Sequence, residues 1–111
     1  MVAGGVGTYI YNNYISDLRA PSSNLADAIR GINITHTTAS STIGLYYNTI
    51  YLNASSSGTN FGTTGVYHTY STTATTATLD MRNNIIANNS TPKGTGITVA
   101  FRRSAATNLN N

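Results

Sequence analysis

The sequence predicts an all-β chain that winds as a solenoid of about three coils, and three observations predict it. Residues that favour strands, such as Ile, Val, Thr and Tyr, are frequent, whereas Leu, Glu and Lys, which support helices, are scarce. A strand-like segment centred on asparagine recurs at a nearly constant spacing. Turn-forming residues separate these segments. Because a period of about 20–50 residues is typical of stacked coils, we expect each coil to pair in parallel with its neighbours.

The length and composition fit a single domain. The 111 residues divide into coils expected at roughly 8–42, 43–77 and 78–107, and we expect them to be a segment of a longer solenoid. Only 8% of the residues are charged, so that Thr, Ser and Asn supply most of the polar surface.

The first segment of each coil aligns on asparagine. The three segments read YIYNNYISD, LYYNTIYLN and DMRNNIIAN, and their shared column is Asn12, Asn48 and Asn83, with spacings of 36 and 35 residues. A strand that turns a corner without a hairpin needs a residue that tolerates positive φ, which Asn does. Amides stacked at the strand spacing also hydrogen-bond to one another. The column therefore predicts a corner with an asparagine ladder.

A second strand-like segment follows in each coil, after a loop. These segments read AIRGINIT, TGVYHTYS and TGITVAFRRS, and we expect the first of them to form a strand at Ile29–Ile34. We expect the loops to be exposed at Pro21–Asn24, Ser55–Thr59 and Ser90–Lys93. The side chains expected to face the interior are Ile50, Leu52, Leu79, Met81, Ile85 and Ala87.

Two structural alternatives remain open. An immunoglobulin-like sandwich also contains many short strands, although it does not predict an asparagine column at constant period. The segment SSNLADAIRG would also suit a short helix that begins after Ser23 or Asn24 and ends before Gly31.

The asparagine-centred units resemble the coils of right-handed parallel β-helix proteins, which have the pectate-lyase-like architecture. In particular, YYNTIYLNASSSG and MRNNIIANNSTPKGTGITVAFRRS resemble repeats of large secreted bacterial surface proteins. The resemblance covers nearly the whole chain. It implies a right-handed parallel β-helix in an extracellular or cell-surface protein, and it specifies architecture better than function.

The residue types that carry catalysis and metal binding are sparse. The acids are Asp17, Asp27 and Asp80, they occupy different columns, and there is no Glu or Cys. Hydrolysis of glycosides needs two facing acids, and calcium needs several oxygen ligands. His36 and His68 are expected to be surface imidazoles one coil apart, too few for a zinc site. We therefore predict no catalytic residue, metal or cofactor in this chain.

The charges and hydropathy also limit the classes of partner that the sequence predicts. The net charge of +3 is spread too widely for a nucleic-acid surface, and Arg82, Arg102 and Arg103 form at most a small patch. No apolar run approaches the length of about 20 residues that spans a membrane. The first residues do not resemble a secretion signal, so export would require a longer precursor. The expected partners are further coils of the parent protein, or other copies of this chain.

Tyrosine offers the main binding hypothesis, because its ring has an apolar face and a polar tip that suit a sugar. The candidates for glycan contact are Tyr47, Tyr51, Tyr67 and Tyr70. The sequence thus favours a non-catalytic structural or adhesive module that contacts polysaccharide. The alternative is a fragment of a β-helix polysaccharide lyase or hydrolase with its catalytic coils elsewhere. Ice binding through threonine arrays is disfavoured, since TTATTAT has no match in the other coils.

Overall fold

The chain forms ten strands in three parallel sheets, as a computed structural model shows for residues 1–4, 7–74 and 76–104. Sheet A contains β1 (Val2–Gly4), β4 (Ile29–His36), β7 (Thr63–Thr69) and β10 (Thr98–Arg103). Sheet B contains β2 (Gly7–Tyr11), β5 (Thr42–Tyr46) and β8 (Thr78–Arg82). Sheet C contains β3 (Tyr14–Ile15), β6 (Thr49–Leu52) and β9 (Ile85–Asn88).

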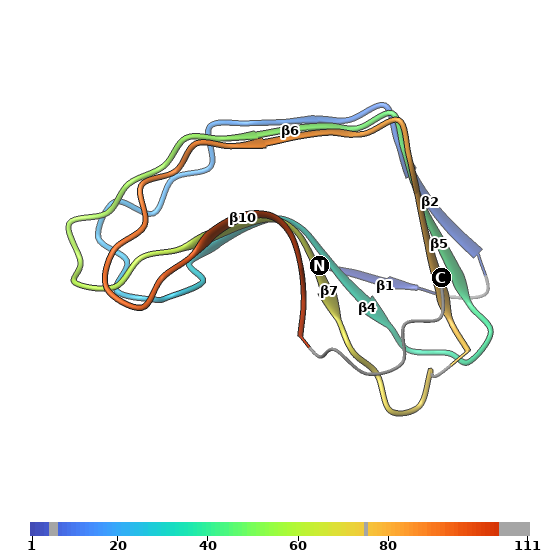
Figure 1. Ribbon diagram of the computed structural model, residues 1–111. Coiled ribbons are helices and arrows are strands. Elements are labelled where there is room, and N and C mark those ends of the chain that lie inside the picture. Colours follow the sequence, from blue (N-terminus) through green and yellow to red (C-terminus); the bar gives the residue numbers. More distant parts are fainter. Residues whose placement is uncertain (5–6, 75, 105–111) are drawn as a thin grey trace.

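Successive passes of the chain stack on one another. Tyr11 pairs with Tyr46, which is 35 residues later, and Tyr46 pairs with Arg82, which is 36 residues later. Figure 1 looks along the stack, so that the three passes nearly overlap. The all-β class and the parallel pairing of about three coils are confirmed. Parallel pairing also excludes the immunoglobulin-like alternative, whose sheets are antiparallel.

The described residues contain no helix, and therefore no helix that could cross a membrane. The segment considered as a short helix instead forms turns, and β4 begins at Ile29 as predicted. The predicted end of the last coil, residues 105–107, lies outside the described residues.

A sharp corner joins sheet B to sheet C in every coil (Figure 1). The residues with positive φ at this corner are Asn12, Tyr47 and Asn83, with φ between 54° and 57°. The next residues form the ladder: Asn13 Nδ2 donates to Asn48 Oδ1 at 2.9 Å, and Asn48 Nδ2 donates to Asn84 Oδ1 at 3.0 Å. The predicted column of Asn12, Asn48 and Asn83 is therefore out of register by one residue at Asn48.

In the observed register, two different residues of each corner perform the two roles that were predicted for one asparagine. The first residue of each corner adopts the left-handed conformation and is exposed. The second supplies the ladder amide, and Asn48, at its centre, is 1% exposed. We call Asn13, Asn48 and Asn84 the corner ladder.

The same slip explains the errors in the predicted interior. Ile50 and Leu52 are buried as expected, but Ile85 is 65% exposed, because Ile86 takes the inward place beside Ile50. Leu79, Met81 and Ala87 are half-buried. The buried apolar core consists of Ile29, Ile32, Ile34, Ile43, Leu45, Ile50, Leu52, Ala54, Phe61 and Val66.

The loops between sheets C and A are less exposed than predicted. Phe61, within the second loop, is completely buried. Ser56 and Ser90 are also buried: Ser56 Oγ donates to Ser23 O at 2.6 Å, and Ser90 Oγ accepts from Ala54 N at 3.1 Å. These bonds tie the loop of one coil to that of the next.

A second polar column, the loop column, runs through the same loops. Asn60 N donates to Asn24 Oδ1 at 2.7 Å, and Thr95 N donates to Asn60 Oδ1 at 3.1 Å. The loops are therefore stacked with the same regularity as the strands.

Sheet A arches toward sheet C, and glycine permits this approach (Figure 1). A Cβ on Gly65 would lie 2.5 Å from Ala100 O and 2.4 Å from the Ile86 side chain. A Cβ on Gly31 would lie 2.6 Å from Gly65 O. The arch thus depends on close backbone contact that only glycine allows at these two positions.

Candidate functional site

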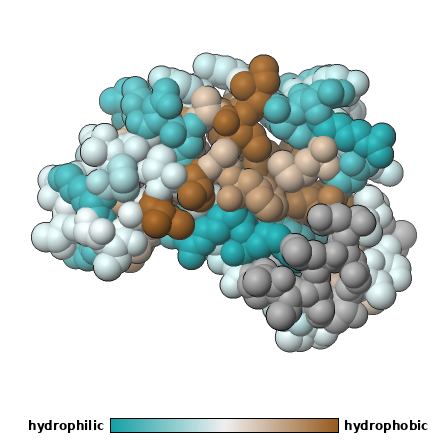
Figure 2. All heavy atoms as spheres, viewed as in Figure 1, coloured by the Kyte–Doolittle hydropathy of each residue, from teal (hydrophilic) through white to brown (hydrophobic). Residues whose placement is uncertain are grey.

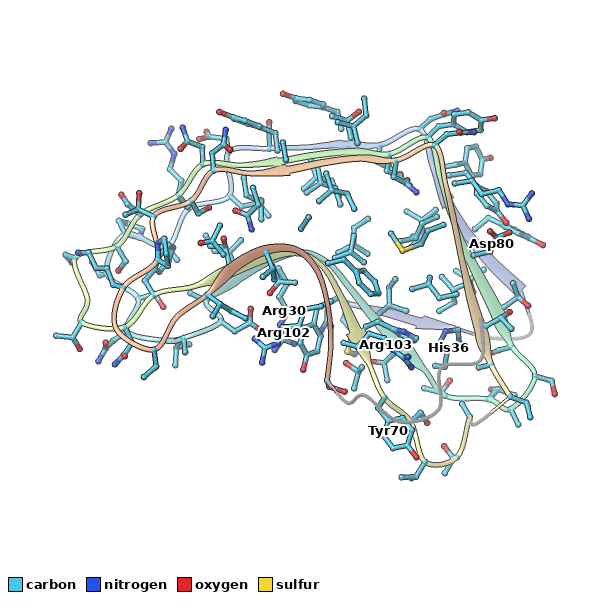
Figure 3. All side chains as sticks on the ribbon, viewed as in Figure 1. Arg30, His36, Tyr70, Asp80, Arg102 and Arg103 are labelled. Carbon is cyan, nitrogen blue, oxygen red and sulfur yellow. The ribbon has the colours of Figure 1, made fainter. Side chains whose placement is uncertain are left out.

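A shallow groove runs along the outer face of sheet C. Because strand side chains alternate, the inward positions of Ile15, Ile50 and Leu52 leave Tyr14 and Tyr51 pointing outward. Tyr14 is 71% exposed and Tyr51 is 37% exposed. Aromatic side chains stand on the outer side of the sheet that contains β6 in Figure 3. The residues that line the groove are Tyr14, Ser16, Asp17, Arg19, Tyr51 and Asn53.

Asp17 reaches the groove through an unusual backbone conformation. Extending the register of β3 and β6 by two residues places Asp17 beside Leu52, whose side chain is fully buried. Asp17 has φ of 56°, in the left-handed region, and Leu18 after it packs against the core. Non-glycine residues in this region are sparsely populated and concentrate at functional sites. The left-handed turn is therefore a second reason, besides the groove itself, to examine Asp17.

An ion pair supplies the polar end of the groove. Arg19 Nε donates to Asp17 Oδ1 at 2.6 Å, and the two side chains are 75% and 72% exposed. The pair thus presents guanidinium donors and carboxylate acceptors side by side, next to two tyrosine rings. Hydroxyl groups that lie next to each other on a ligand suit such a donor and acceptor pair.

The structure does not bring the four predicted tyrosines together. Tyr51 lines the groove, whereas Tyr47 stands at the corner and is 62% exposed. Tyr67 lies on the outer side of sheet A, where the guanidinium of Arg30 sits 3.7 Å from its ring centroid and that of Arg102 sits at 5.5 Å. Tyr70 is half-buried.

Four residues that line the groove were not predicted from the sequence: Tyr14, Asp17, Arg19 and Asn53. Tyr14 and Asn53 could have been found from strand alternation once the corner was in register. The turn at Asp17 has no signal in the residue types, because the other coils do not repeat it.

The three acids are each paired with an arginine close in sequence. Besides Asp17, Asp27 Oδ2 accepts from Arg30 Nε at 2.8 Å, and Asp80 Oδ1 accepts from Arg82 Nε at 2.9 Å. The hydrogen bond from Arg82 lowers the pKa of the Asp80 carboxyl below its ordinary value. Among the described residues no carboxylate is paired with another carboxylate. This arrangement stabilises the ionised form of Asp80, the opposite of what a general acid requires.

The two histidines are buried, which contradicts the expectation of surface imidazoles. His36 is 3% exposed and His68 is 9% exposed, and their rings meet edge to face with centroids 5.1 Å apart. Ser41 Oγ lies 3.0 Å from His36 Nδ1. Burial lowers the pKa of both rings; that of His68 falls to about 4, helped by neighbouring His36 and Arg103. Both imidazoles are therefore neutral at pH 7.

A small cavity adjoins these histidines, and Tyr70 and Arg103 help to line it (Figure 3). Its volume of about 20 Å³ is enough for one water molecule. No group of three or more His, Cys, Asp or Glu side chains that could hold a metal is found within the part of the chain that is described.

In the described parts of the chain, arginine side chains form no extended basic surface and threonine side chains form no regular array. Arg82 lies on the outer side of sheet B with Asp80, whereas Arg102 contacts Tyr67 on sheet A. Thr42 Oγ1 lies 3.0 Å from Thr78 Oγ1, but the first coil places Gly7 beside Thr42. The threonine column is thus interrupted after two coils.

No family model, curated protein or solved structure matched the chain in three comparisons with known proteins.

Proposed function

We propose that this chain is a non-catalytic segment of a right-handed parallel β-helix, serving as a structural or adhesive module of an extracellular or cell-surface protein. Its binding surface is the Tyr14–Tyr51 groove, and its ligand class is polysaccharide. The pectate-lyase-like resemblance of the asparagine-centred units supports the handedness and the location. The three stacked parallel sheets are compatible with a β-helix.

The groove is the observation that carries the binding proposal. Two outward tyrosines on a rigid sheet provide apolar faces for the C–H side of a pyranose ring. Asp17 and Arg19, which are mostly exposed, provide charged hydrogen-bonding groups for hydroxyls. An open groove of this kind fits an extended chain better than an isolated small molecule, since small ligands favour enclosed, mostly apolar pockets.

The experiment is a binding titration against defined glycans. The probes are cellohexaose, xylohexaose, mannohexaose and an oligogalacturonate, measured by calorimetry and by chemical-shift changes. We expect at least one to bind, and Tyr14→Ala or Tyr51→Ala to weaken that binding at least about tenfold, which corresponds to about 1.4 kcal/mol. The matched control is Tyr11→Ala, since Tyr11 is 59% exposed on the outer side of sheet B.

Two results would contradict the proposal. The first is a lack of binding to every probe, and the second is an equal loss with Tyr11→Ala. The same incubations, with and without calcium, test for turnover. Release of reducing ends or unsaturated products, abolished by Asp17→Ala or Asp80→Ala, would favour the enzyme alternative.

A further inference from the structure

The two ends of the stack present strand edges whose pairing is incomplete. Among the described residues, the strands of the last coil (β8, β9 and β10) pair only with the preceding coil. At the other end, β2 and β3 pair only with the following coil, whereas β1 pairs with Ile34–His36 of β4, where the end of β10 of a preceding copy would otherwise lie. A contact between two copies in register therefore uses sheets B and C. Edges of this kind are templates for pairing with another chain.

Both ends also uncover part of the apolar interior. Ile10, Leu45 and Met81 form one column in register; Leu45 is 1% exposed, while Ile10 and Met81 are half-buried. Phe101 is 42% exposed and lines a hollow at the last coil with Leu79 and Met81. Ile10, Ile15 and Ile32 line the corresponding hollow at the first coil. Figure 2, viewed along the stack, shows apolar residues in the middle of one end with polar residues around them.

The corner ladder gives these ends opposite hydrogen-bonding character. Two of its members donate toward the next coil: Asn13 N and Nδ2 donate to Asn48 Oδ1, and Asn48 N and Nδ2 donate to Asn84 Oδ1. Asn48 Nδ2 and Asn84 Nδ2 also donate backward, to Ile10 O at 2.9 Å and to Leu45 O at 2.8 Å. Within the described chain, the backbone N–H groups of Asn83 and Asn84 meet no acceptor, and Asn13 Oδ1 meets no donor.

We infer that a second copy of this chain docks head to tail through sheets B and C, with β2 and β3 of its first coil on β8 and β9 of its neighbour's last coil. The interior register predicts the bonds. Asn12 N donates to Tyr46 O and Tyr47 N to Arg82 O, so Asn83 N would donate to Tyr11 O of the next copy. Asn84 N and Nδ2 would donate to its Asn13 Oδ1. Asn13 Nδ2, which bonds Tyr11 O in its own chain, would donate to Met81 O.

The polarity of the corner ladder selects this arrangement over a symmetric one. At the corner ladder, two last coils face to face would place the Asn84 donors against each other, whereas a first coil against a last coil matches them with Asn13 Oδ1. Such a contact is heterologous, since it uses different surfaces on the two copies, and each dimer leaves both end types available. The assembly is therefore an open row, and its length grows with concentration. This inference does not depend on the glycan groove.

The test blocks one end at a time with lysine in the Ile10–Met81 column. Ile10→Lys blocks the first coil and Met81→Lys blocks the last. Both side chains are half-buried at an open end, so a lysine stem can direct its charge to water. Sedimentation velocity over a wide concentration range gives the mass, and circular dichroism verifies the fold. The matched control is Met81→Leu, which preserves an apolar end.

We expect the wild-type chain and Met81→Leu to reach an average mass at least twice that of one chain. Each lysine variant alone stays monomeric, and their mixture forms a one-to-one dimer and nothing larger. The inference is overturned if the wild-type chain remains monomeric at all concentrations, if either lysine variant alone still assembles, or if the folded variants fail to combine.

A cross-link provides a test that leaves the apolar ends intact. Tyr11 and Arg82 are exposed and occupy one column, two strand spacings apart in the chain, or about 9.6 Å. Head-to-tail docking brings Tyr11 of one copy within about 4.8 Å of Arg82 of its neighbour, a distance suited to a disulfide. The double variant Tyr11→Cys, Arg82→Cys should therefore give a ladder of linear multimers on oxidation. Multimers formed equally with Thr8→Cys, Arg82→Cys would contradict the register.

Discussion

At the scale of single residues, the side chain of Asn48 contributes most to the corner. Its amide makes four hydrogen bonds, to the backbone or side chain of Asn13, Ile10 and Asn84. We expect Asn48→Ala to lower the free energy of unfolding by about 2–4 kcal/mol, because partners that are partly buried lose their bonds. Urea unfolding measures the change. Asn89→Ala, at an exposed loop position, should change it by less than about 0.5 kcal/mol; equal effects would show that the ladder contributes nothing.

The buried histidines predict the pH dependence of stability. Burial lowers the pKa of His68 to about 4 in the folded chain, below the ordinary histidine value of 6.5. The unfolded chain therefore takes up a proton first, and stability falls as the pH falls from about 6.5 toward 4. We expect a loss of about 2 kcal/mol between pH 7 and pH 5, measured by urea midpoints. His68→Gln should flatten this dependence, and an unchanged slope would contradict the role of burial.

At the scale of elements, the arch of sheet A depends on its glycines. Gly65→Ala would place a methyl group against Ala100 O and the Ile86 side chain, so one of the sheets must move. We expect a destabilisation of at least about 2 kcal/mol, measured by thermal and urea unfolding. Gly7→Ala is the control, because the nearest atom to its Cβ is the Tyr9 hydroxyl at 3.9 Å. Similar losses for both variants would argue against the close contact.

The strands could be predicted from the sequence better than their register. Alternating β-branched residues identify strands, and the spacing of asparagines identifies the period. The first and third corners contain two adjacent asparagines, however, and the second contains Tyr47 and Asn48. Residue type alone cannot tell which asparagine adopts positive φ and which supplies the ladder amide. A bulky tyrosine at positive φ runs against the usual preference, so aligning asparagine with asparagine shifted the register by one residue.

The groove and the burial of the histidines could not be predicted from the sequence, for a related reason. Asp17 faces outward only because of a left-handed turn that the other coils lack. His36 and His68 are polar residues in inward strand positions, where an apolar residue is the usual expectation. Both features depend on how one coil departs from the repeat, whereas a periodic pattern reports only what the coils share.

At the scale of the whole molecule, stability should grow with the number of coils. Among the described residues each strand pairs with strands of adjacent coils, and Thr42, at the start of β5, pairs with Thr78 in the next coil. Repeating residues 43–78 directly after Thr78 therefore adds one coil in register. We expect a higher unfolding midpoint in urea and an m-value about one third larger, because m scales with the surface exposed on unfolding. An unchanged m-value would indicate that the added coil remains unfolded.

The two polar columns have a consequence for the electrostatics of such a stack. Every hydrogen-bonded amide carries a dipole, and a helix sums its dipoles into a field at its ends. In the corner ladder the bonds between asparagine side chains point from earlier to later coils, while Asn48 Nδ2 and Asn84 Nδ2 also donate backward to backbone carbonyls. In the loop column they point from later to earlier coils, from Asn60 to Asn24 and from Thr95 to Asn60. The two rows of dipoles oppose each other, so lengthening the stack accumulates little field at either end.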